Sequence, residues 1–433
     1  MEKKTTEEIM AKLNISQLNK MQEMAIKKAD WDQDLVLLSP TGSGKTLAYL
    51  LPLLKKIDPK KPGVQALIVV PTRELAVQVE NVLRDMGTGY KVNSFFGGRP
   101  KSIDRENLRS QPTIAIGTPG RLSDHFESER IYAKTVANIV LDEFDKCLEA
   151  GFEDEMKSIF QWCNLCRTRM LTSATQHQKV PEFVGLRNPA EIEYFPEFES
   201  KLMLKTIYSP YKDKLDTLYQ AICHMGNQPG VVFCNFKDSI QRVSDFLKLK
   251  GITHSTFHGD LDQNNREKSL IKFRNGSSQV LLASDLAARG LDVDDLGFVM
   301  HYHIPMKEHE FTHRNGRTAR MNKDGIAYVL RWVDDQDLPA YIEDYPEEVL
   351  SDAPHPDQAK WETLCMSVGR KDKVSKGDIA GFLSKQGNLS RDDLGKIEIQ
   401  PHMSYAAVNP AKLQALLKIH SKIKNNKVRI THL

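Results

Sequence analysis

Residues 34–54 read "DLVLLSPTGSGKTLAYLLPLL", and this stretch decides the fold of the first part of the chain. The apolar run at 34–38 predicts a strand, and the apolar stretch that begins at Leu47 predicts a helix. Gly42 and Gly44 let the turn between them place backbone N–H groups, and the start of the helix, against a phosphate. The sequence therefore predicts a phosphate-binding loop, although Ser39 stands where the general pattern has glycine. Its expected ligand-binding residues are Thr41, Gly42, Ser43, Gly44, Lys45 and Thr46.

Two of these residues have side-chain roles in a loop of this kind. Lys45 is expected to reach the β- and γ-phosphates of a nucleoside triphosphate, and Thr46 is expected to ligate Mg²⁺. The loop alone does not reveal what the nucleotide hydrolysis drives.

A second stretch, "VLDEFDKCLEAGF" at residues 140–152, places acids at the end of a buried strand. Buried acids are costly unless they bind a cation or are otherwise paired. Asp142 suits the Mg²⁺ shell of a P-loop enzyme, and Glu143 suits the general base that polarises the attacking water. The alternative is an ordinary helix start, because acids stabilise a helix N-terminus. Phe144 is expected to point into the core, since side chains on an extended strand end alternate between two sides.

Apolar runs like the one at 34–38 recur along the chain and alternate with amphipathic, helical stretches. Unbroken apolar strands separated by helices indicate parallel sheets that are covered on both faces. The polar, proline-containing stretch at 190–212 separates two such series, so we expect α/β domains at 1–200 and 201–335. The candidate strands are 34–38, 66–70, 113–116, 138–141 and 169–172 in the first domain, and 231–234, 253–257, 279–284, 298–303 and 327–330 in the second.

The end of the chain has a different character. Residues 333–357 carry nine acids, no Lys or Arg, and four prolines, which predicts an acidic linker at 336–360. Residues 361–433 carry 13 Lys and Arg against 6 Asp and Glu. Their pattern predicts a small βαββαβ domain, whose second helix is expected at 409–423. The basic charge indicates a nucleic-acid-binding domain, with a merely solvated basic face as the alternative.

"HRNGRTAR" at residues 313–320 lies in the second domain and supplies two further candidates. Arg317 and Arg320 are spaced i, i+3, so a helix would place them on one face. Arginines of this kind suit a phosphate clamp that is completed when two domains close. The alternative is a basic helix face that binds solvent or RNA phosphate.

Further motifs follow one another in order between residues 10 and 335. Together they make the chain resemble the DEAD-box ATP-dependent RNA helicases of superfamily 2. The resemblance implies two RecA-like domains in tandem. The motifs are "PTRELAVQ" (71–78), "GG" (97–98), "TPGR" (118–121), "SAT" (173–175), "FHGDLDQNNR" (257–266), "ASDLAARGLDV" (283–293) and "HRNGRTAR".

The resemblance also implies a role for each matching residue. Gln22 would read adenine, which makes ATP the expected nucleotide, and Arg317 and Arg320 would be the arginine fingers. The expected ligands of the RNA backbone are Thr72, Arg73, Gly98, Thr118 and Arg121, with Asp124 supporting Arg121. Asp145, Ser173 and Thr175 would couple the ATP site to domain closure. Asp285 and Arg289 would help position the RNA-binding and closed-state contacts, and Gly290 and Asp292 would approach the γ-phosphate and the ribose.

The basic end resembles the C-terminal RNA-binding domain of DbpA-type helicases, which has the layout of an RNA recognition motif (RRM). Aromatic base-stacking positions are not evident, since "SYAAV" offers only Tyr405. We therefore expect charged and polar RNA contacts. The candidates are Arg370, Lys371, Lys373, Lys376, Lys422, Lys424, Lys427 and Arg429.

The sequence thus predicts an RNA-dependent ATPase that unwinds RNA locally, with ribosomal RNA of the large subunit as the partner that the resemblance implies. A general RNA chaperone, an ATP-gated RNA clamp with little turnover and a DNA-directed helicase remain as alternatives. No apolar run approaches the roughly 20 residues that span a bilayer, so we expect no membrane association. We expect a cytoplasmic monomer whose six sparse cysteines are free or buried thiols; a metal site at Cys163 and Cys166 is the weaker alternative.

Overall fold

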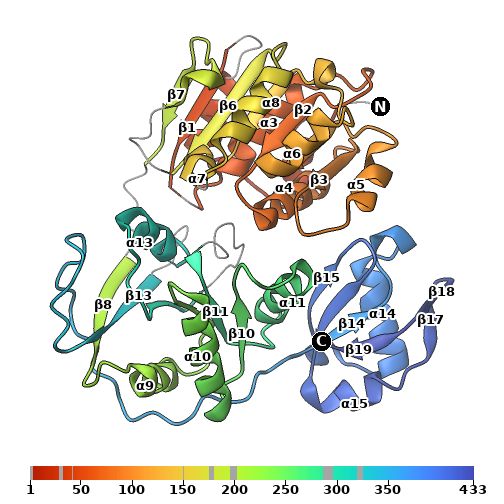
Figure 1. Ribbon diagram of the computed structural model, residues 1–433. Coiled ribbons are helices and arrows are strands. Elements are labelled where there is room, and N and C mark those ends of the chain that lie inside the picture. The colour runs from red at the N-terminus through yellow and green to blue at the C-terminus, as the bar shows by residue number, and fades with distance from the viewer. Residues whose placement is uncertain are drawn as a thin grey trace. The chain divides into compact units, whose positions relative to one another are not determined.

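The computed structural model describes residues 3–28, 33–40, 42–149, 151–174, 180–195, 202–285, 296–318 and 325–433 (Figure 1). These residues form two compact units, one that contains the described residues up to 195 and one that contains those from 202 onward. No helix in these ranges is both long and apolar enough to cross a bilayer.

The first unit is built on a seven-stranded parallel sheet in the order β3-β4-β2-β5-β6-β1-β7. Leu35 and Leu37 pack into the core on one face of the sheet, and Val36 between them packs into the core on the other face. Helices cover both faces, which explains why the central strands are apolar throughout. The strands are β1 (Leu35–Leu38), β2 (Ala66–Val69), β3 (Val92–Phe95), β4 (Ile114–Gly117), β5 (Asn138–Leu141), β6 (Thr168–Ser173) and β7 (Ala190–Glu193). The helices are α1 (Thr6–Lys12), α2 (Lys20–Lys28), α3 (Lys45–Lys56), α4 (Arg73–Asp85), α5 (Lys101–Leu108), α6 (Pro119–Glu127), α7 (Phe144–Glu149) and α8 (Glu153–Trp162).

The second unit begins with a six-stranded parallel sheet in the order β10-β11-β9-β12-β13-β8. Its strands are β8 (Leu202–Ser209), β9 (Gly230–Phe233), β10 (His254–Phe257), β11 (Val280–Ala283), β12 (Phe298–His301) and β13 (Gly325–Trp332). Its helices are α9 (Leu215–Met225), α10 (Lys237–Leu249), α11 (Gln263–Arg274) and α13 (Glu308–Asn315). The two parallel sheets confirm the predicted pair of RecA-like folds.

Three strands of the two parallel sheets were not predicted from the sequence. β3 and β7 are the edges of the first sheet, and β8 is an edge of the second. An edge strand has a neighbour on one side only, and β7 alternates between buried and exposed residues. Polar residues are therefore tolerated there, which is why the stretch at 190–212 looked like a simple break between domains.

The acidic segment at 336–360 follows the second sheet and contacts the second helicase domain at several points. Glu347 forms a parallel bridge with Thr206 of β8. Further along, Asp357 and Asn227 exchange two hydrogen bonds of 2.7 and 2.9 Å, and the His355 ring contacts the Lys250 carbonyl at 2.9 Å. The segment is thus a packed strap on the second domain as well as a connection.

The second unit ends in a small antiparallel sheet in the order β15-β16-β14-β19. The predicted βαββαβ order is confirmed by β14 (Glu362–Met366), α14 (Lys376–Gly387), β15 (Leu394–Ile399), β16 (Ser404–Val408), α15 (Leu413–Leu416) and β19 (Ile430–His432). The helix expected at 409–423 is wrong in extent, because it ends at Leu416. Residues 421–428 form a hairpin of β17 (Ser421–Ile423) and β18 (Asn426–Val428), in which apolar Ile423 and Val428 join the core.

All six cysteines are buried and free. Cys163 and Cys166 lie in the core of the first domain, where burial raises the pKa of each thiol, to about 12 for Cys163 and about 11 for Cys166.

Candidate ATP site and RNA-binding surfaces

The loop between β1 and α3 has the backbone of a phosphate cradle. Gly42 and Gly44 have φ angles of 82° and 88°, which strain any residue with a side chain. Gly44 precedes the first turn of α3 and gives it no side-chain cap, so the N–H groups of that turn are available to a ligand. Ser39 fits beneath the loop, where its hydroxyl donates to the Ser43 hydroxyl at 2.6 Å. Thr41 lies outside the described residues.

Lys45 is the one cation that this loop carries, and it is largely buried. Its ammonium group donates to the carbonyl oxygens of Ser39 and, at 3.2 Å, Pro40. A buried ammonium group is stable only with strong acceptors around it, and a polyphosphate supplies such acceptors.

Asp142 lies at the end of β5 with both carboxylate oxygens engaged. The Thr172 hydroxyl donates to Oδ1 at 2.6 Å, and the Tyr49 hydroxyl donates to Oδ2 at 2.9 Å. Burial raises the pKa of Asp142, although Thr172, Tyr49 and the charge of Lys45 oppose that rise. Neither Tyr49 nor Thr172 was singled out from the sequence. Only their place, on the helix and the strand that flank Asp142, reveals their role.

Glu143 is held in a left-handed backbone conformation, with a φ angle of 51°. Its N–H donates to the Thr172 hydroxyl at 3.0 Å, so Thr172 connects the two acids. Such strain in a residue other than glycine costs about 1 kcal/mol or more and is concentrated at functional sites. The conformation turns the chain from β5 directly into α7 at this point.

Phe144 is the first residue of α7 and does not lie on an extended strand end, so the expected alternation of side chains was the wrong reason. Its direction was nevertheless correct, because Phe144 is 2% exposed and packs in a core cluster with Leu122 and Phe126. Asp145, in the first turn of the same helix, is fully buried. The acids therefore begin a helix and also lie beside the phosphate loop.

Gln22 on α2 is joined to the phosphate loop. Its side-chain amide donates to the Gly44 carbonyl at 3.2 Å, while its Oε1 accepts from the Asn19 N–H at 3.0 Å. Asn19 in turn donates to the Ser43 carbonyl at 2.9 Å. A side chain on residue 44 would approach Gln22 Nε2 to 2.6 Å, which is a second reason for a glycine there. Ser173 reaches the same loop from β6, because its carbonyl accepts from the Ser39 N–H at 3.0 Å.

The expected RNA-binding residues of the first domain follow the ends of β2, β3 and β4. Thr72 caps α4 by accepting from the Leu75 N–H at 3.2 Å. The Arg73 guanidinium lies so close to Gly98 that a Cβ there would meet Nη1 at 2.1 Å. Thr118 precedes α6, which carries Arg121.

Asp104 on α5 holds Arg121, and the expectation that Asp124 does so is wrong. Arg121 Nε donates to Asp104 Oδ2 at 2.7 Å, whereas Asp124 pairs with Lys101 at 2.7 Å. Asp104 is fully buried and also contacts Arg99 and His125. Burial alone would raise the pKa of Asp104, but His125 and the two arginines lower it overall. Asp104 was missed because no short motif connects it to Arg121.

In the second domain, the arginine motif at 313–320 does not form the single helix face that the sequence predicts. α13 ends at Asn315, so Arg317 lies beyond the helix, where it is largely buried. Arg314, which was not singled out, is 2% exposed and donates to Asp285 at 2.6 Å and to the His303 carbonyl at 2.7 Å. Thr175, Arg289, Gly290, Asp292 and Arg320 lie outside the described residues.

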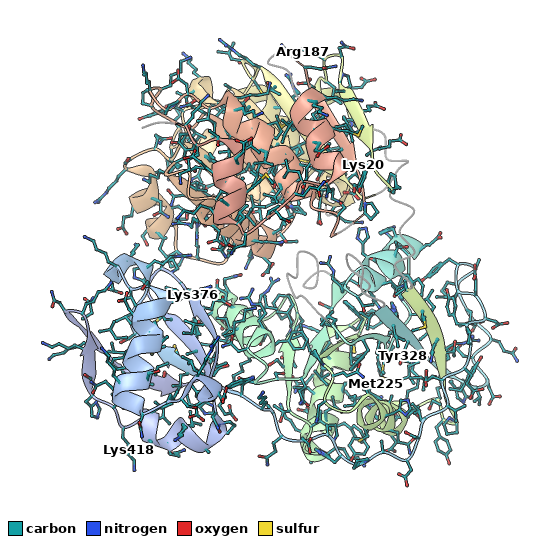
Figure 2. The ribbon with its side chains drawn as sticks, turned by 180° about the vertical axis from the view of Figure 1, so that it is seen from behind. Lys20, Arg187, Met225, Tyr328, Lys376 and Lys418 are labelled. Carbon is teal, nitrogen blue, oxygen red and sulfur yellow. The ribbon has the colours of Figure 1, made fainter. Side chains whose placement is uncertain are left out.

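The expected tail residues form an exposed basic turn and hairpin, made of Arg370, Lys371 and Lys373 beside Lys422, Lys424 and Lys427. Lys424 donates to the Lys373 carbonyl at 2.6 Å, and this contact joins the turn to the hairpin. Lys422 lies directly opposite Lys427, a pairing of like charges that destabilises a hairpin unless an anion neutralises it. Lys376 opens α14, at the other end of the domain from Lys418 (Figure 2).

A phosphate loop, a buried strand-end aspartate and a glutamate beside it, all on a parallel sheet, define a P-loop nucleoside triphosphatase of RecA-like fold. Three family models match the chain: DEAD/DEAH box helicase at residues 19–183, Helicase conserved C-terminal domain at 213–322, and DbpA RNA binding domain at 363–432. The chain belongs to the DEAD-box ATP-dependent RNA helicases and, within them, to the DbpA type.

Relatives that match over most of their length support this assignment. The ATP-dependent RNA helicase DbpA of Escherichia coli (strain K12) is 34% identical over 396 residues, which cover 88% of this chain and 86% of that protein. The ATP-dependent RNA helicase DbpA of Bacillus subtilis (strain 168) is 30% identical over 454 residues, covering 96% and 94%. Among solved structures, S. cerevisiae Dbp5 bound to RNA and ADP BeF3 matches the fold with a TM-score of 0.69 at 24% identity, over 80% of this chain and 94% of that one.

Proposed function

We propose that this helicase uses Mg²⁺–ATP to separate short duplexes in large-subunit ribosomal RNA or its precursor, and that its tail domain tethers it there. The basic turn and hairpin carry the proposal, because they form an exposed cationic surface on a domain of the DbpA RNA-binding family. The proposed domains are two helicase domains at 1–200 and 201–335, the strap at 336–360 and the tail domain at 361–433.

In the ATP site, Lys45 would bind the β- and γ-phosphates, and the glycine loop would hold them through backbone N–H groups. Thr46 and Asp142 would hold Mg²⁺, largely through water, and the bound ion supplies charge neutralisation on the phosphates. Glu143 would accept a proton from the attacking water, and Gln22 would read adenine. Arg317 and Arg320 would stabilise the charge that develops on the transferred phosphate.

The remaining proposed residues connect hydrolysis to RNA. Thr72, Arg73, Gly98, Thr118 and Arg121 would hold the RNA backbone without reading sequence, because phosphate and sugar contacts carry no sequence information. Asp145, Ser173 and Thr175 would couple the ATP site to closure of the two helicase domains. Gly290 and Asp292 would complete the ATP site on closure. Sequence preference would then come from the tail domain, through Arg370, Lys371, Lys373 and the lysines of the hairpin. We also propose that the protein acts as a cytoplasmic monomer.

The test measures ATPase stimulation by large-subunit rRNA fragments, by unrelated RNA and by DNA. We expect one rRNA fragment to stimulate the enzyme at a concentration about tenfold lower than the others, since a tethering domain raises the effective concentration of its target. Equal stimulation by every RNA would support a general RNA chaperone instead. Tight binding without turnover would support an ATP-gated clamp, and equal stimulation by DNA would contradict RNA specificity.

A pair of matched variants tests the tethering surface. Lys422→Glu/Lys427→Glu should abolish the preference for one fragment while leaving ATPase activity at saturating generic RNA unchanged, because the ATP site is untouched. Lys412→Glu/Lys418→Glu makes the same change of charge beside α15 and should keep the preference. If both variants behave alike, the hairpin is not the tether.

A further inference from the structure

One face of the tail sheet is closed, in part by a helix from outside the tail domain. Along β14 and β16, Leu364, Met366, Ala406 and Val408 point into the core with α14. Alternate residues point to the opposite face. In an RRM layout, this opposite face is the one on which aromatic side chains stack bases. Here its central residues are at most 5% exposed: Thr363, Cys365, Tyr405 and Ala407.

The cover is α11 of the second helicase domain (Figure 1). Ile271 of α11 is fully buried in one cluster with Cys365 and Tyr405, with Met403 and Leu433 packed around it. This places the single aromatic candidate for base stacking, Tyr405, inside a contact between domains.

Polar contacts border the apolar centre and fix its register. Arg274 at the end of α11 donates to Glu398 of β15 at 2.8 Å, with both side chains about one-quarter exposed. Just beyond the helix, the Ser277 and Thr363 hydroxyls are 2.6 Å apart and both are buried. A buried hydroxyl pair satisfies both partners only in the docked arrangement.

Trp361 fills the remaining edge of this contact. A Cβ on Gly276, which follows α11, would approach its ring to 3.2 Å, and so would a Cβ on Gly395 of β15. The indole therefore lies between the two domains at positions where neither neighbour has a side chain. The last strap contact, Asp357 with Asn227, is only a few residues earlier, so docking closes a short loop at small entropic cost.

We propose that the sheet face of the tail domain is a docking surface for α11 of its own chain, and that it does not bind RNA. The tail domain is then held at a fixed position on the second helicase domain. The consequence for RNA rests on the proposed function. RNA bound by the basic turn and hairpin would lie at a set distance from the second helicase domain, and Tyr405 would not stack on a base.

Cys365 provides a direct readout of docking, because it lies on the covered face. In the full chain, alkylation of Cys365 by iodoacetamide can be followed by peptide mass spectrometry, with buried Cys163 and Cys234 as internal references. Arg274→Glu replaces an ion pair by two facing carboxylates and should accelerate labelling of Cys365 about tenfold. The swap Arg274→Glu/Glu398→Arg restores opposite charges and should return the rate toward that of the unmodified chain. A loss of folding would instead expose the reference cysteines too.

Binding of purified bacterial large-subunit rRNA then separates docking from RNA recognition. Arg274→Glu should bind this RNA within about threefold of the original affinity, since the ion pair lies outside the basic hairpin, while unwinding of an attached duplex falls and the swap restores it. Faster Cys365 labelling on RNA binding, or about tenfold tighter RNA binding by Arg274→Glu, would overturn the proposal, because the sheet face would then be an RNA site that docking blocks. In Lys422→Glu/Lys427→Glu, Cys365 should stay protected. If that variant binds RNA normally, the tethering role fails while the docking surface stands.

Discussion

The hydroxyl of Tyr49 donates to Oδ2 of Asp142 across 2.9 Å, inside a fully buried site. Tyr49 lies one helical turn beyond the phosphate loop, and Asp142 lies at the end of β5. Together with Thr172, Tyr49 fixes the carboxylate in one orientation. Burial and the nearby Asp142 raise the pKa of Tyr49 well above its usual range, so the phenol remains a donor. The helix that begins at the phosphate loop therefore also positions the acid proposed to hold Mg²⁺.

Tyr49→Phe should weaken Mg²⁺-dependent nucleotide binding. The substitution leaves one buried carboxylate oxygen without its donor, which costs about 1–2 kcal/mol, or about 5- to 30-fold in affinity. Titration with a fluorescent ATP analogue should show this loss in Mg²⁺ and little change in EDTA. Tyr90→Phe is the control, since the Tyr90 hydroxyl has no hydrogen-bond partner. Equal losses with and without Mg²⁺ would mean that Tyr49 supports only the loop.

Glu143→Gln should keep ATP binding and lose most turnover. The amide has nearly the same shape as the carboxylate but cannot accept a proton from water, and general-base catalysis contributes about 10²–10⁴-fold. RNA-stimulated phosphate release and nucleotide affinity should be measured on the same preparation. Near-normal phosphate release would rule out Glu143 as the base.

Phe144→Ala should lower stability without raising turnover. Phe144 fills a core cluster, and removing such a ring costs about 3–5 kcal/mol through the cavity that remains. Thermal unfolding of the first domain should occur at a lower temperature, while ATPase activity measured well below that temperature stays near its original rate. A large gain in turnover would instead show that Phe144 restrains the acids on either side of it.

The second helicase domain should lose stability in mild acid because of His301. Burial and the charge of Arg314 lower the pKa of this imidazole to about 3. In the unfolded chain, His301 therefore binds a proton below about pH 6.5, whereas in the folded domain it stays neutral until about pH 3. The contribution of His301 to the free energy of unfolding is thus complete above about pH 6.5 and is lost as the pH falls toward 3. At pH 5 the loss is about 2 kcal/mol from this group.

His301→Gln removes that titration and keeps an amide that can donate to Asn315, whose Oδ1 lies 2.8 Å from the ring. Chemical denaturation at pH 7 and pH 5 should show a smaller difference for this variant than for the original chain. His303, whose pKa burial lowers to about 4, should leave a residual dependence in both. If the two proteins showed the same pH dependence of stability, His301 would be excluded as a source of the loss of stability in acid.

Prediction from sequence worked best where the chemistry is local. The phosphate loop and the acids at 142–143 are contiguous motifs, and the central strands are apolar because helices cover both faces of each sheet. Prediction from sequence failed for side-chain contacts between residues that are far apart in the chain. Asp104 holds Arg121 from another helix, and Thr172 joins Asp142 to Glu143 from a neighbouring strand. Nothing in the spacing of these residues along the chain brings them together.

By itself, the sequence determined the two parallel-sheet domains, the basic βαββαβ tail and the order of the helicase motifs, since each depends on periodicity, composition or short-range spacing. Only the tertiary structure decided which groups hold the site acids, that the acidic segment is a strap, and that Tyr405 faces α11. The physical reason is that burial is decided by what packs on a surface. A sheet face that is exposed and one that is covered can have the same alternation of side chains along the strand. The residues that cover this face are also remote in the chain, since Ile271 and Tyr405 are 134 positions apart.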